Sequence, residues 1–547
     1  MQRSLDLRNV SFGKDDAAIE ARQGFLGKVF LKTSFYHRVR NRQKFLVTGR
    51  KGSGKSAICF SIKDALEAEG RNAIFITTRL LSVPKMQQIK GTAINDQERF
   101  ESSWRYIFLV KIAIELIRLV DLREQDFSHF DSQERRQLRE VRIFLSRNNE
   151  IDKDVWQKLI SFLNIFSKFS AKLPGGMEAG IETRQIETVR DLSNMLDKFE
   201  ECILALLNKS KIFGTTILVD EVDDIWDSTE ESKPLIIGLL NAVRKLNSSL
   251  NPNIAILLFL RSDIWDGLSF SDKDKFRSED ERISWSEDDL KQLIVIRAKI
   301  SANLDHSLSD ADQVWDALFE KQVGSQNSFE YIVDRTLKRP REVIQFCNLA
   351  LSVAQDFGRL KITEEDILAA EARYSIWKLD DLINEFKIQY PFLRDFLSIF
   401  DGFRVSFSKD QINLKFEESK KVLVRKFPEL HVLDLDSFLQ LLFGLGFVGA
   451  RVAGKDLYLH DDPDRPRIVL TNLVNLENIV VHPAFHLALG LRSYIIQSEN
   501  ISITQQNYGG ANYQIRVGGG NVFIGGEHIV GDKITNKKIK QIDSSDE

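Results

Sequence analysis

The segment from Gly49 to Ser56 constrains the fold more than any other part of the sequence. It reads Gly-Arg-Lys-Gly-Ser-Gly-Lys-Ser and fits the pattern G-x-x-x-x-G-K-[ST]. An apolar run, Phe45 to Thr48, precedes it, and apolar residues at helical spacing follow from Ser56 to Glu69. This strand, loop and helix order turns backbone N–H groups of a glycine-rich loop and a helix N-terminus toward one anion. The segment therefore predicts a phosphate-binding loop within an α/β sheet.

The side chains of this loop predict how a nucleotide binds. Lys55 is expected to reach the β- and γ-phosphates, and the Ser56 hydroxyl is expected to ligate Mg²⁺. The cofactors implied are ATP and Mg²⁺. The residues expected to contact the nucleotide are Gly49, Arg50, Lys51, Gly52, Ser53, Gly54, Lys55, Ser56 and Ala57.

A second apolar run, Thr216 to Val219, ends in Asp220 and Glu221. Ligands of open α/β sheets bind at the carboxyl ends of strands, so both carboxylates should lie near the phosphates. We expect Asp220 to hold the metal through water and Glu221 to orient and deprotonate the attacking water, which predicts an ATP hydrolase. The acidic residues from Asp223 to Asp227 are expected to cap or flank the next helix. Since no Asn-Lys-x-Asp motif follows the loop, ATP is favoured over GTP.

Arginines elsewhere are weaker candidates for reading the γ-phosphate. The apolar run Ile254 to Leu260 is followed by Arg261 and Ser262, either of which could sense hydrolysis, although a salt-bridged strand end explains Arg261 equally well. Arg341, after Lys-Arg-Pro, starts a helix and is either a nucleotide-facing lid arginine or a surface residue. An arginine finger for a neighbouring subunit could come from Lys275 to Arg277 or from Arg282, and a solvated charge run explains both.

A chain of 547 residues is too long for one hydrophobic core, so several domains are expected. Continuous apolar runs suit the central strands of a parallel sheet covered by helices on both faces. The predicted fold class is α/β, a P-loop NTPase sheet with a helical insertion, a helical lid, a winged-helix domain and a short β-rich tail. The predicted boundaries are 1–40 (N-terminal adaptor helix), 41–305 (nucleotide-binding core, with the insertion at about 90–211), 306–385 (lid), 386–495 (winged helix) and 496–547 (Gly/Asn-rich tail, its end disordered).

Two features of the C-terminal part leave alternatives open. The wing residues Arg451 and Lys455 could touch DNA phosphates, but the expected recognition helix offers Asp436, Ser437 and Gln440, so protein contact is favoured. His482 and His486 have the spacing of a zinc pair on a helix, yet packing or capping is favoured. The glycine-punctuated tail is either a flexible end or an edge for self-assembly or partner docking.

The composition limits the cellular compartments and the classes of binding partner that we expect. The charges of the 76 basic and 79 acidic residues nearly cancel, so the net charge of the chain does not indicate binding to nucleic acid or to a membrane. Three scattered cysteines fit a reducing compartment. The N-terminus lacks the apolar stretch of an export signal, and no apolar run reaches the roughly 20 residues of a membrane span. A cytoplasmic location without membrane attachment is expected.

Taken together, the Gly49–Ala57 loop, the Asp220–Glu221 strand, the strand with a polar tip, the lid arginine and the winged helix resemble the AAA+ and STAND branches of the P-loop ATPases. The Lys338–Asn348 segment and the His482–His486 segment also resemble a group of poorly characterised bacterial P-loop ATPases. The resemblance implies a nucleotide-controlled signalling switch that forms homo-oligomers, with a role in anti-phage defence as one hypothesis. The alternative is a DNA-binding ATPase of the loader or initiator type. The sequence departs from the pattern in its long insertion and in Lys-Arg-Pro-Arg, where many AAA+ members have glycine before the arginine.

Overall fold

The computed structural model describes most of the chain. The described residues are 6–77, 96–122, 130–147, 150–151, 153–154, 157–158, 189–210, 214–226, 230, 232–250, 252, 254–303, 310–461, 479–492, 522–524 and 527–529. The chain divides into two compact units, one formed by residues 16–284 and the other by residues 1–15 with 285–547.

A parallel five-stranded sheet organises the unit of residues 16–284. Its strand order is β2-β3-β4-β1-β5, and every neighbouring pair runs parallel. The strands are β1 (Leu46–Gly49), β2 (Ala73–Thr77), β3 (Thr215–Asp220), β4 (Ile254–Arg261) and β5 (Asp280–Arg282). β1, β3 and nearly all of β4 are buried, as continuous apolar runs predict for central strands.

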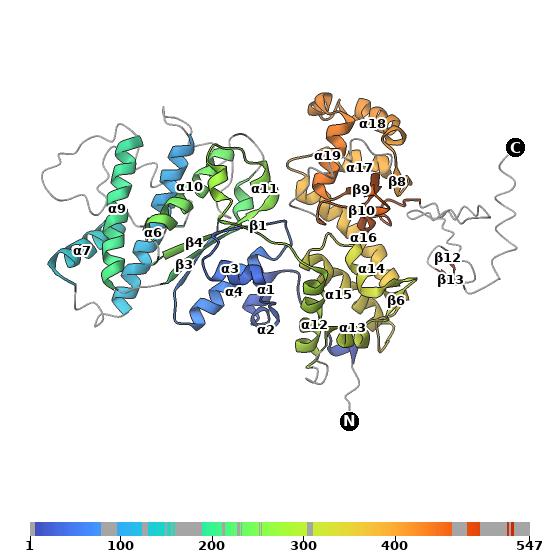
Figure 1. Ribbon diagram of the computed structural model, residues 1–547, viewed down its shortest axis with the longest axis horizontal. Coiled ribbons are helices and arrows are strands. Elements are labelled where there is room, and N and C mark those ends of the chain that lie inside the picture. Colours follow the sequence, from blue (N-terminus) through green and yellow to red (C-terminus); the bar gives the residue numbers. More distant parts are fainter. Residues whose placement is uncertain are drawn as a thin grey trace. The chain divides into compact units, whose positions relative to one another are not determined.

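Helices cover both faces of this sheet. Figure 1 shows α10 on one side of the strands and α4 on the other. The helices of the unit are α1 (Ala17–Arg22), α2 (Leu26–Val29), α3 (Ser34–Arg40), α4 (Lys55–Ala68), α6 (Asp96–Leu122), α7 (Ser132–Arg147), α9 (Val189–Ser210), α10 (Lys233–Leu250) and α11 (Ser262–Gly267), with short 3₁₀ turns η3 (Val222–Ile225) and η4 (Lys273–Phe276). The first 40 residues contain three short helices and a 3₁₀ turn, whereas one adaptor helix was predicted.

The predicted helical insertion between β2 and β3 is formed by α6, α7 and α9. Side chains of all three join the strands and α10 in one hydrophobic core, so the insertion is continuous with the core of its unit. α6 crosses α10 closely at Gly238, where a Cβ would lie 2.7 Å from the Glu101 nitrogen. The predicted helix from Trp156 to Phe169 and the Pro174 break lie almost wholly outside the described residues.

The second unit begins with α12, which starts after the predicted cap Ser286. Its lid-forming elements are α12 (Glu287–Ala302), α13 (Ala311–Leu318), α14 (Ser328–Asp334), α15 (Pro340–Asp356) and α16 (Glu364–Phe386), with a small hairpin of β6 (Gln322–Val323) and β7 (Gln326–Asn327). The unit boundary lies at 284/285, whereas the prediction placed it at 305, because α12 packs its apolar face into the lid core.

The N-terminal residues also belong to this helical unit. Phe12 is buried in its core, and the 3₁₀ turn η1 (Leu7–Asn9) packs beside it. Asn348 accepts a hydrogen bond from the Phe12 nitrogen at 3.3 Å and donates one to the Gly13 carbonyl at 2.9 Å. The segment had no helical or strand pattern to reveal this docking, so the sequence did not predict it.

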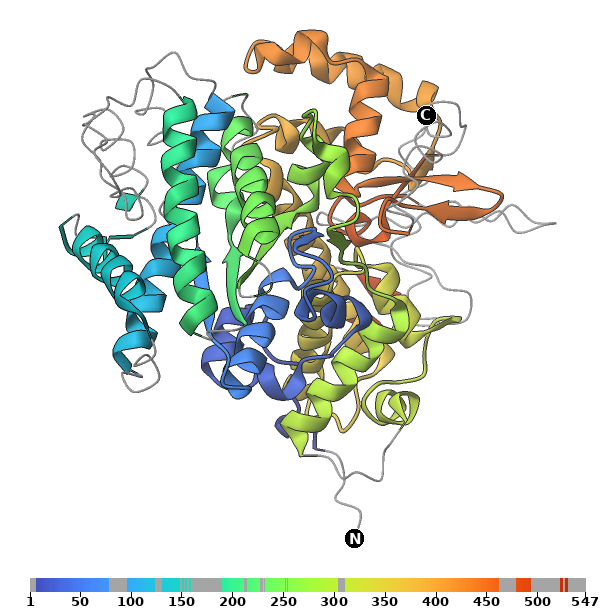
Figure 2. The same ribbon diagram turned by 60° about the vertical axis from the view of Figure 1, so that its left-hand side comes forward.

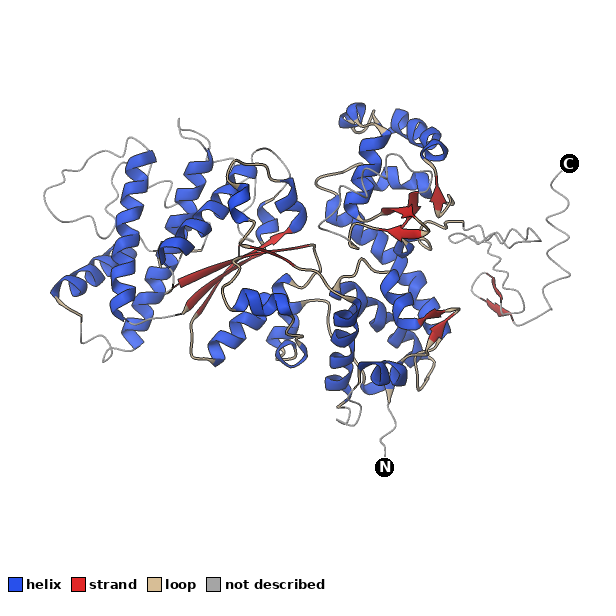
Figure 3. Ribbon diagram, viewed as in Figure 1, coloured by secondary structure: helices blue, strands red, loops and turns tan. Residues whose placement is uncertain are grey.

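The winged-helix domain is confirmed after the lid. Its helical elements are α17 (Leu393–Leu397), η5 (Ser398–Phe400), α18 (Lys409–Leu423), η6 (Pro428–Val432) and α19 (Leu435–Leu445), and its sheet has the order β10-β9-β11-β8. The strands are β8 (Ser406–Phe407), β9 (Val448–Val452), β10 (Lys455–Leu457) and β11 (Ile479–Val481). Figure 3 shows this small sheet against the helices. The short strands β8 and β11 were not predicted.

Two details complete the C-terminal part. His482 precedes the 3₁₀ turn η7 (Pro483–Phe485) and caps it by accepting the Ala484 N–H at 3.1 Å, which confirms a capping role. In the tail, β12 (Val522–Ile524) pairs with β13 (Glu527–Ile529), in the region predicted to be β-prone. The observed architecture confirms the predicted α/β P-loop NTPase fold class. In the part of the chain that the structure describes, no helix is long and apolar enough to cross a membrane.

Candidate functional site

The phosphate-binding loop occupies the turn between β1 and α4. Gly52 and Gly54 have φ angles of 81° and 98°, a region in which a side chain is strained. Gly54 immediately precedes Lys55, the first residue of α4, so the loop runs straight into a helix N-terminus. The glycines therefore provide the inward-turned backbone that a phosphate cradle requires.

Gly49 is needed for a different reason, namely close packing. A Cβ at this position would lie 2.4 Å from the Ser53 Oγ and 3.3 Å from the Ile283 Cδ1. The Ser53 nitrogen donates to the Arg50 carbonyl at 3.1 Å, which closes the turn over Gly49. Only glycine lets this loop fold back onto the end of β1.

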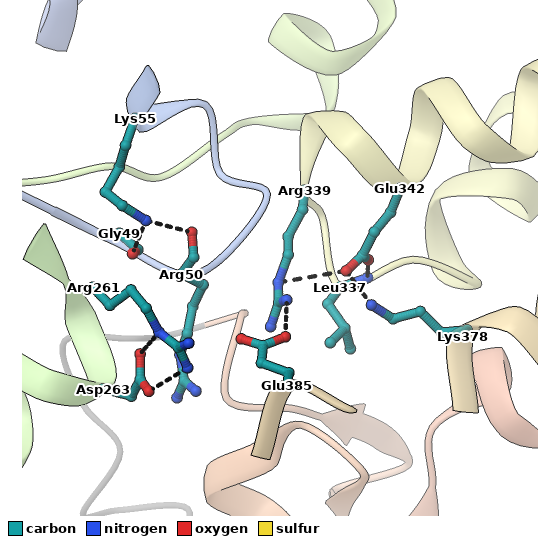
Figure 4. A network of polar contacts seen from close by, with 10 residues as sticks. All are labelled: Gly49, Arg50, Lys55, Arg261, Asp263, Leu337, Arg339, Glu342, Lys378 and Glu385. Atoms are coloured by element: carbon teal, nitrogen blue, oxygen red, sulfur yellow. Dashed lines mark hydrogen bonds and ion pairs between the residues drawn. The ribbon is translucent and has the colours of Figure 1, made fainter. Parts of the chain in front are cut away.

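Lys55 points back across its own loop. Its Nζ donates to the carbonyls of Gly49 at 2.8 Å and Arg50 at 3.1 Å, as Figure 4 shows. Desolvation lowers the pKa of the Lys55 amine, while the nearby carboxylates of Asp223 and Asp220 oppose that shift. The amine thus lies in the loop, among backbone carbonyls, where the resemblance places a phosphate-binding lysine.

Asp220 and Ser56 meet below the loop. Ser56 and the Glu221 N–H lie close enough to the Asp220 carboxylate to lower its pKa. Asp220 is buried, and burial raises its pKa in spite of these two groups and the charge of Lys55. Two residues that were predicted separately as metal ligands, from distant parts of the chain, are therefore neighbours in the fold.

Glu221 has an unusual backbone conformation. Its φ of 63° and ψ of 31° lie in the left-handed region, directly after β3 and before η3. For a residue other than glycine such a conformation costs on the order of 1–3 kcal/mol, and it persists where the surroundings impose it. This residue ends the extended backbone of β3 and leads directly into η3.

Arg261 ends β4 next to the loop strand. The register pairs it with Gly49 of β1, so the two residues lie side by side at the carboxyl edge of the sheet. Its guanidinium forms a bidentate ion pair with Asp263, at 3.0 Å and 2.6 Å (Figure 4). Burial opposes ionisation of Asp263, yet the charges of Arg261 and then of Arg50 keep the pKa of that carboxyl below its ordinary value. Ser262, the alternative sensor, is buried as the first residue of α11.

The lid motif Lys338-Arg339-Pro340-Arg341 forms the turn before α15. Pro340 is the first residue of that helix, and Arg339 is buried against Glu342 at 3.5 Å and Glu385 at 3.3 Å. Arg341 donates through its Nε to the Asp15 carbonyl at 3.0 Å, in the N-terminal segment of the same unit. Because Arg341 belongs to the other compact unit, its role at the phosphates stays a prediction.

The finger candidates lie along the segment before and within β5. Lys275 pairs with Asp272 at 2.9 Å, and Phe276 between the candidates is buried in the core. Arg282 pairs with Asp266 and stays partly exposed. These surface ion pairs are weak, so they leave both predictions open.

The sequence analysis missed two residues that complete the site. Asp263 fixes Arg261, and the spacing Arg-x-Asp at a strand end was the available signal. Asp223 lies within the helical turn η3, and its charge opposes the lowering of the Lys55 pKa. Among the described residues no group of three or more His, Cys, Asp or Glu side chains could hold a metal ion. One carboxylate and one hydroxyl suit Mg²⁺, which binds proteins through few ligands and completes its shell with water and phosphate.

Comparisons with known proteins identify partial likenesses. Residues 288–383 match the FunZ-associated C-terminal helical domain, which corresponds to α12 through most of α16. The "Putative transposon gamma-delta 80.3 kDa protein" of Escherichia coli (strain K12) is 24% identical over 528 residues, covering 93% of this chain and 71% of that protein. Two solved structures also resemble the chain, Cdc6p from Pyrobaculum aerophilum and Drosophila ORC bound to DNA. The first is 14% identical with a TM-score of 0.26, covering 83% of this chain and 94% of that one. The second is 11% identical with a TM-score of 0.28, covering 88% of each.

Proposed function

We propose that the protein is a Mg²⁺-dependent ATPase that acts as a nucleotide-controlled switch. One observation carries the proposal: Ser56 lies close enough to the buried Asp220 carboxylate to lower its pKa, at the start of the helix that follows a loop with the backbone of a phosphate cradle. Ser56 in the first turn of α4 and Asp220 at the end of β3 come from elements that lie far apart in the sequence. Their meeting is the arrangement that binds a metal ion together with phosphates.

Each residue then has a defined task. The loop N–H groups and Lys55 bind the phosphates, and Ser56 with Asp220 would hold the metal. Bound Mg²⁺ would supply positive charge that neutralises the β- and γ-phosphate oxygens. Glu221, which directly follows Asp220 in a left-handed backbone conformation, orients water and accepts its proton. Arg261, held by Asp263, contributes a fixed positive charge at the same edge of the sheet.

Turnover and binding measurements with point variants test the enzyme. Glu221→Gln removes the base and keeps the shape, so ATP hydrolysis should fall by about 10²-fold or more while nucleotide binding persists. Lys55→Ala should weaken binding itself. Lys63→Ala, on the exposed face of the same helix, is the matched control and should behave as wild type. Equal turnover in wild type and Glu221→Gln would refute hydrolysis as the function.

The switch is proposed to act through lid closure and homo-oligomer assembly. This extension rests on the resemblance to AAA+ and STAND proteins and on the second unit that joins lid and winged helix. Mass photometry of the full chain with ATP, ADP and no nucleotide tests it. We expect an oligomer to form when ATP is added, and we expect it to persist longer in the Glu221→Gln variant. A single monomeric species in all three conditions would remove the assembly proposal.

Bacterial anti-phage defence is the biological role proposed for the switch, and it rests on that resemblance alone. Plaque formation by a panel of phages on cells producing wild type or Lys55→Ala tests it. Protection that requires Lys55 supports the role, whereas equal plaque numbers on all cells would remove it. DNA loading through the winged helix is less favoured, because the wing residue Arg451 is paired with Asp456 at 2.6 Å and 2.9 Å.

A further inference from the structure

Helix α7 of the insertion is a well-anchored element with one exposed face. Its N-terminus is capped from both directions, because the Asp131 carboxylate accepts the Glu134 N–H at 2.9 Å and the Glu134 carboxylate accepts the Asp131 N–H at 2.9 Å. Val141, Phe144 and Leu145 are buried in the core of the unit. Figure 2 shows α7 at the outer edge of the insertion, beside α6 and α9. The helix therefore presents a fixed outward surface.

Arginine predominates on that surface, which also includes Ser132, Gln133, Ile143 and Ser146. The exposed positions of α7 include five arginines: Arg135, Arg136, Arg139, Arg142 and Arg147. At about 100° per residue they share an arc of roughly 140°, opposite the buried residues. The chain has 76 basic residues in 547, so a helix of 16 residues would contain about two by composition alone. α7 contains five and has no lysine.

The acidic residues of the helix do not balance this face. Glu134 is buried in the cap, and Glu140 lies at the margin of the arc, paired with Arg136 at 3.2 Å. On the neighbouring helix, Asp121 pairs with Arg142. The two arginines are 56% and 46% exposed, so these are surface pairs worth roughly 0–1 kcal/mol, which a stronger anion can replace.

We propose that this arginine face of α7 binds the phosphate backbone of nucleic acid. Guanidinium groups bind phosphate oxygens through two parallel N–H donors, which is why arginine without lysine favours this ligand. Positions 135 to 147 span about 18 Å of helix, and duplex DNA carries about one negative charge per 1.7 Å of its axis. The surface can therefore contact several phosphates at once, and we expect its binding to be independent of base sequence.

An acidic protein fits this face less well. Protein interfaces depend on buried aromatic or aliphatic anchors, and the arc offers only Ile143, which is 41% exposed. The winged helix is also a poorer nucleic-acid surface, because its expected recognition helix α19 has no lysine or arginine and carries Asp436 in its first turn. The proposal is independent of the nucleotide site, so loss of ATPase activity and loss of nucleic-acid binding are separable results.

Fluorescence anisotropy of the full chain tests the proposal. The probes are labelled mixed-sequence duplex DNA of about 30 base pairs, the matching duplex RNA and single-stranded DNA, over roughly 50–200 mM salt. The variant Arg136→Gln/Arg139→Gln/Arg142→Gln keeps good helix formers at exposed positions. Three lost phosphate contacts should lower the slope of log affinity against log salt on duplex DNA by about 3 and weaken low-salt binding at least tenfold.

Two control variants distinguish an effect of the α7 arginines from a general effect of net charge and from binding by the wing of the winged helix. Arg22→Gln/Lys28→Gln/Lys32→Gln removes the same charge from other exposed positions and should keep the wild-type slope. Arg451→Gln/Lys455→Gln should do the same. The Arg→Lys version of the α7 variant should keep most of the slope with lower affinity. Absence of salt-dependent binding to all probes, or an equal loss in the first control or the wing variant, would overturn the proposal.

Discussion

The buried ion pair between Glu342 of α15 and Lys378 of α16 should be the electrostatic contact on which the lid most depends. Glu342 accepts hydrogen bonds from Lys378 and from the Leu337 nitrogen at 2.5 Å, and Arg339 lies 3.5 Å away (Figure 4). The side chains of Glu342 and Lys378 are only 4% and 5% exposed. This cluster joins two helices and fixes the turn that carries Arg341.

Lys378→Met removes the charge and keeps much of the volume. Removing one partner of a buried pair costs about 3–5 kcal/mol, and we expect the lower end because Arg339 remains beside Glu342. For a unit of this size each kcal/mol lowers the melting temperature by about 2–4 °C, so a drop of roughly 6–12 °C is expected near neutral pH. Lys387→Met, at an exposed position, is the control and should change little.

Acidification should erase this difference. Burial alone would raise the pKa of Glu342, but Lys378 and Arg339 hold that pKa below its ordinary value. A carboxyl whose pKa is lower in the folded state than in the unfolded state contributes stability at pH values above its unfolded-state pKa. This contribution disappears as the pH falls through the folded-state pKa. The melting temperatures of wild type and Lys378→Met should therefore converge in acid.

Thermal unfolding followed by circular dichroism measures the effect, and Glu342→Gln/Lys378→Met completes a double-mutant cycle. The double variant should recover most of the loss, since neither charge is then left alone. The reasoning is refuted if Lys378→Met stays within about 0.5 kcal/mol of the control, or if the losses of the two single variants simply add.

Three further predictions concern the catalytic edge, the insertion and the winged helix. Asp263→Asn should lower ATP turnover by about tenfold because Arg261 loses its bidentate partner. In a chain that already carries Arg261→Ala, Asp263→Asn should cause no further loss of turnover. If the two losses add instead, Asp263 does not act by positioning Arg261. Gly238→Ala should destabilise the unit of residues 16–284 by roughly 1–3 kcal/mol, since the alanine Cβ would lie 2.7 Å from the backbone of α6. Denaturant titrations measure this change. An unchanged unfolding midpoint would show that α6 shifts freely to make room. Burial lowers the pKa of His460 and of His486 to about 4, so between pH about 6.5 and 4 the unfolded chain binds more protons than the folded chain. Stability should therefore fall as the pH drops through that window, by roughly 3 kcal/mol for each imidazole. Calorimetry at both ends checks this, and His486→Gln should flatten the dependence.

Local sequence determined the elements of the nucleotide site. Gly49 to Ser56 specify their loop because only glycine tolerates the backbone of positions 52 and 54 and the close packing at position 49. The apolar runs of β3 and β4 determine buried parallel strands, and their first polar residues, Asp220 and Arg261, must then lie at the carboxyl edge. Ser286 and Thr363, which cap α12 and α16, are local signals of the same kind.

Tertiary structure alone decided which of these residues meet. The strand order β2-β3-β4-β1-β5 joins Ser56 to Asp220 and sets Arg261 beside Gly49, and no local pattern encodes contacts over such separations. The docking of Phe12 into the lid core is likewise invisible in the sequence, because an extended segment has no periodicity. The Gly49–Ser56 loop was predictable from its own residues, and Asp263 lies only two positions from the Arg261 that it holds. The proximity of Ser56 to Asp220 depends instead on the packing of α4 against the end of β3, two elements that lie far apart in the chain.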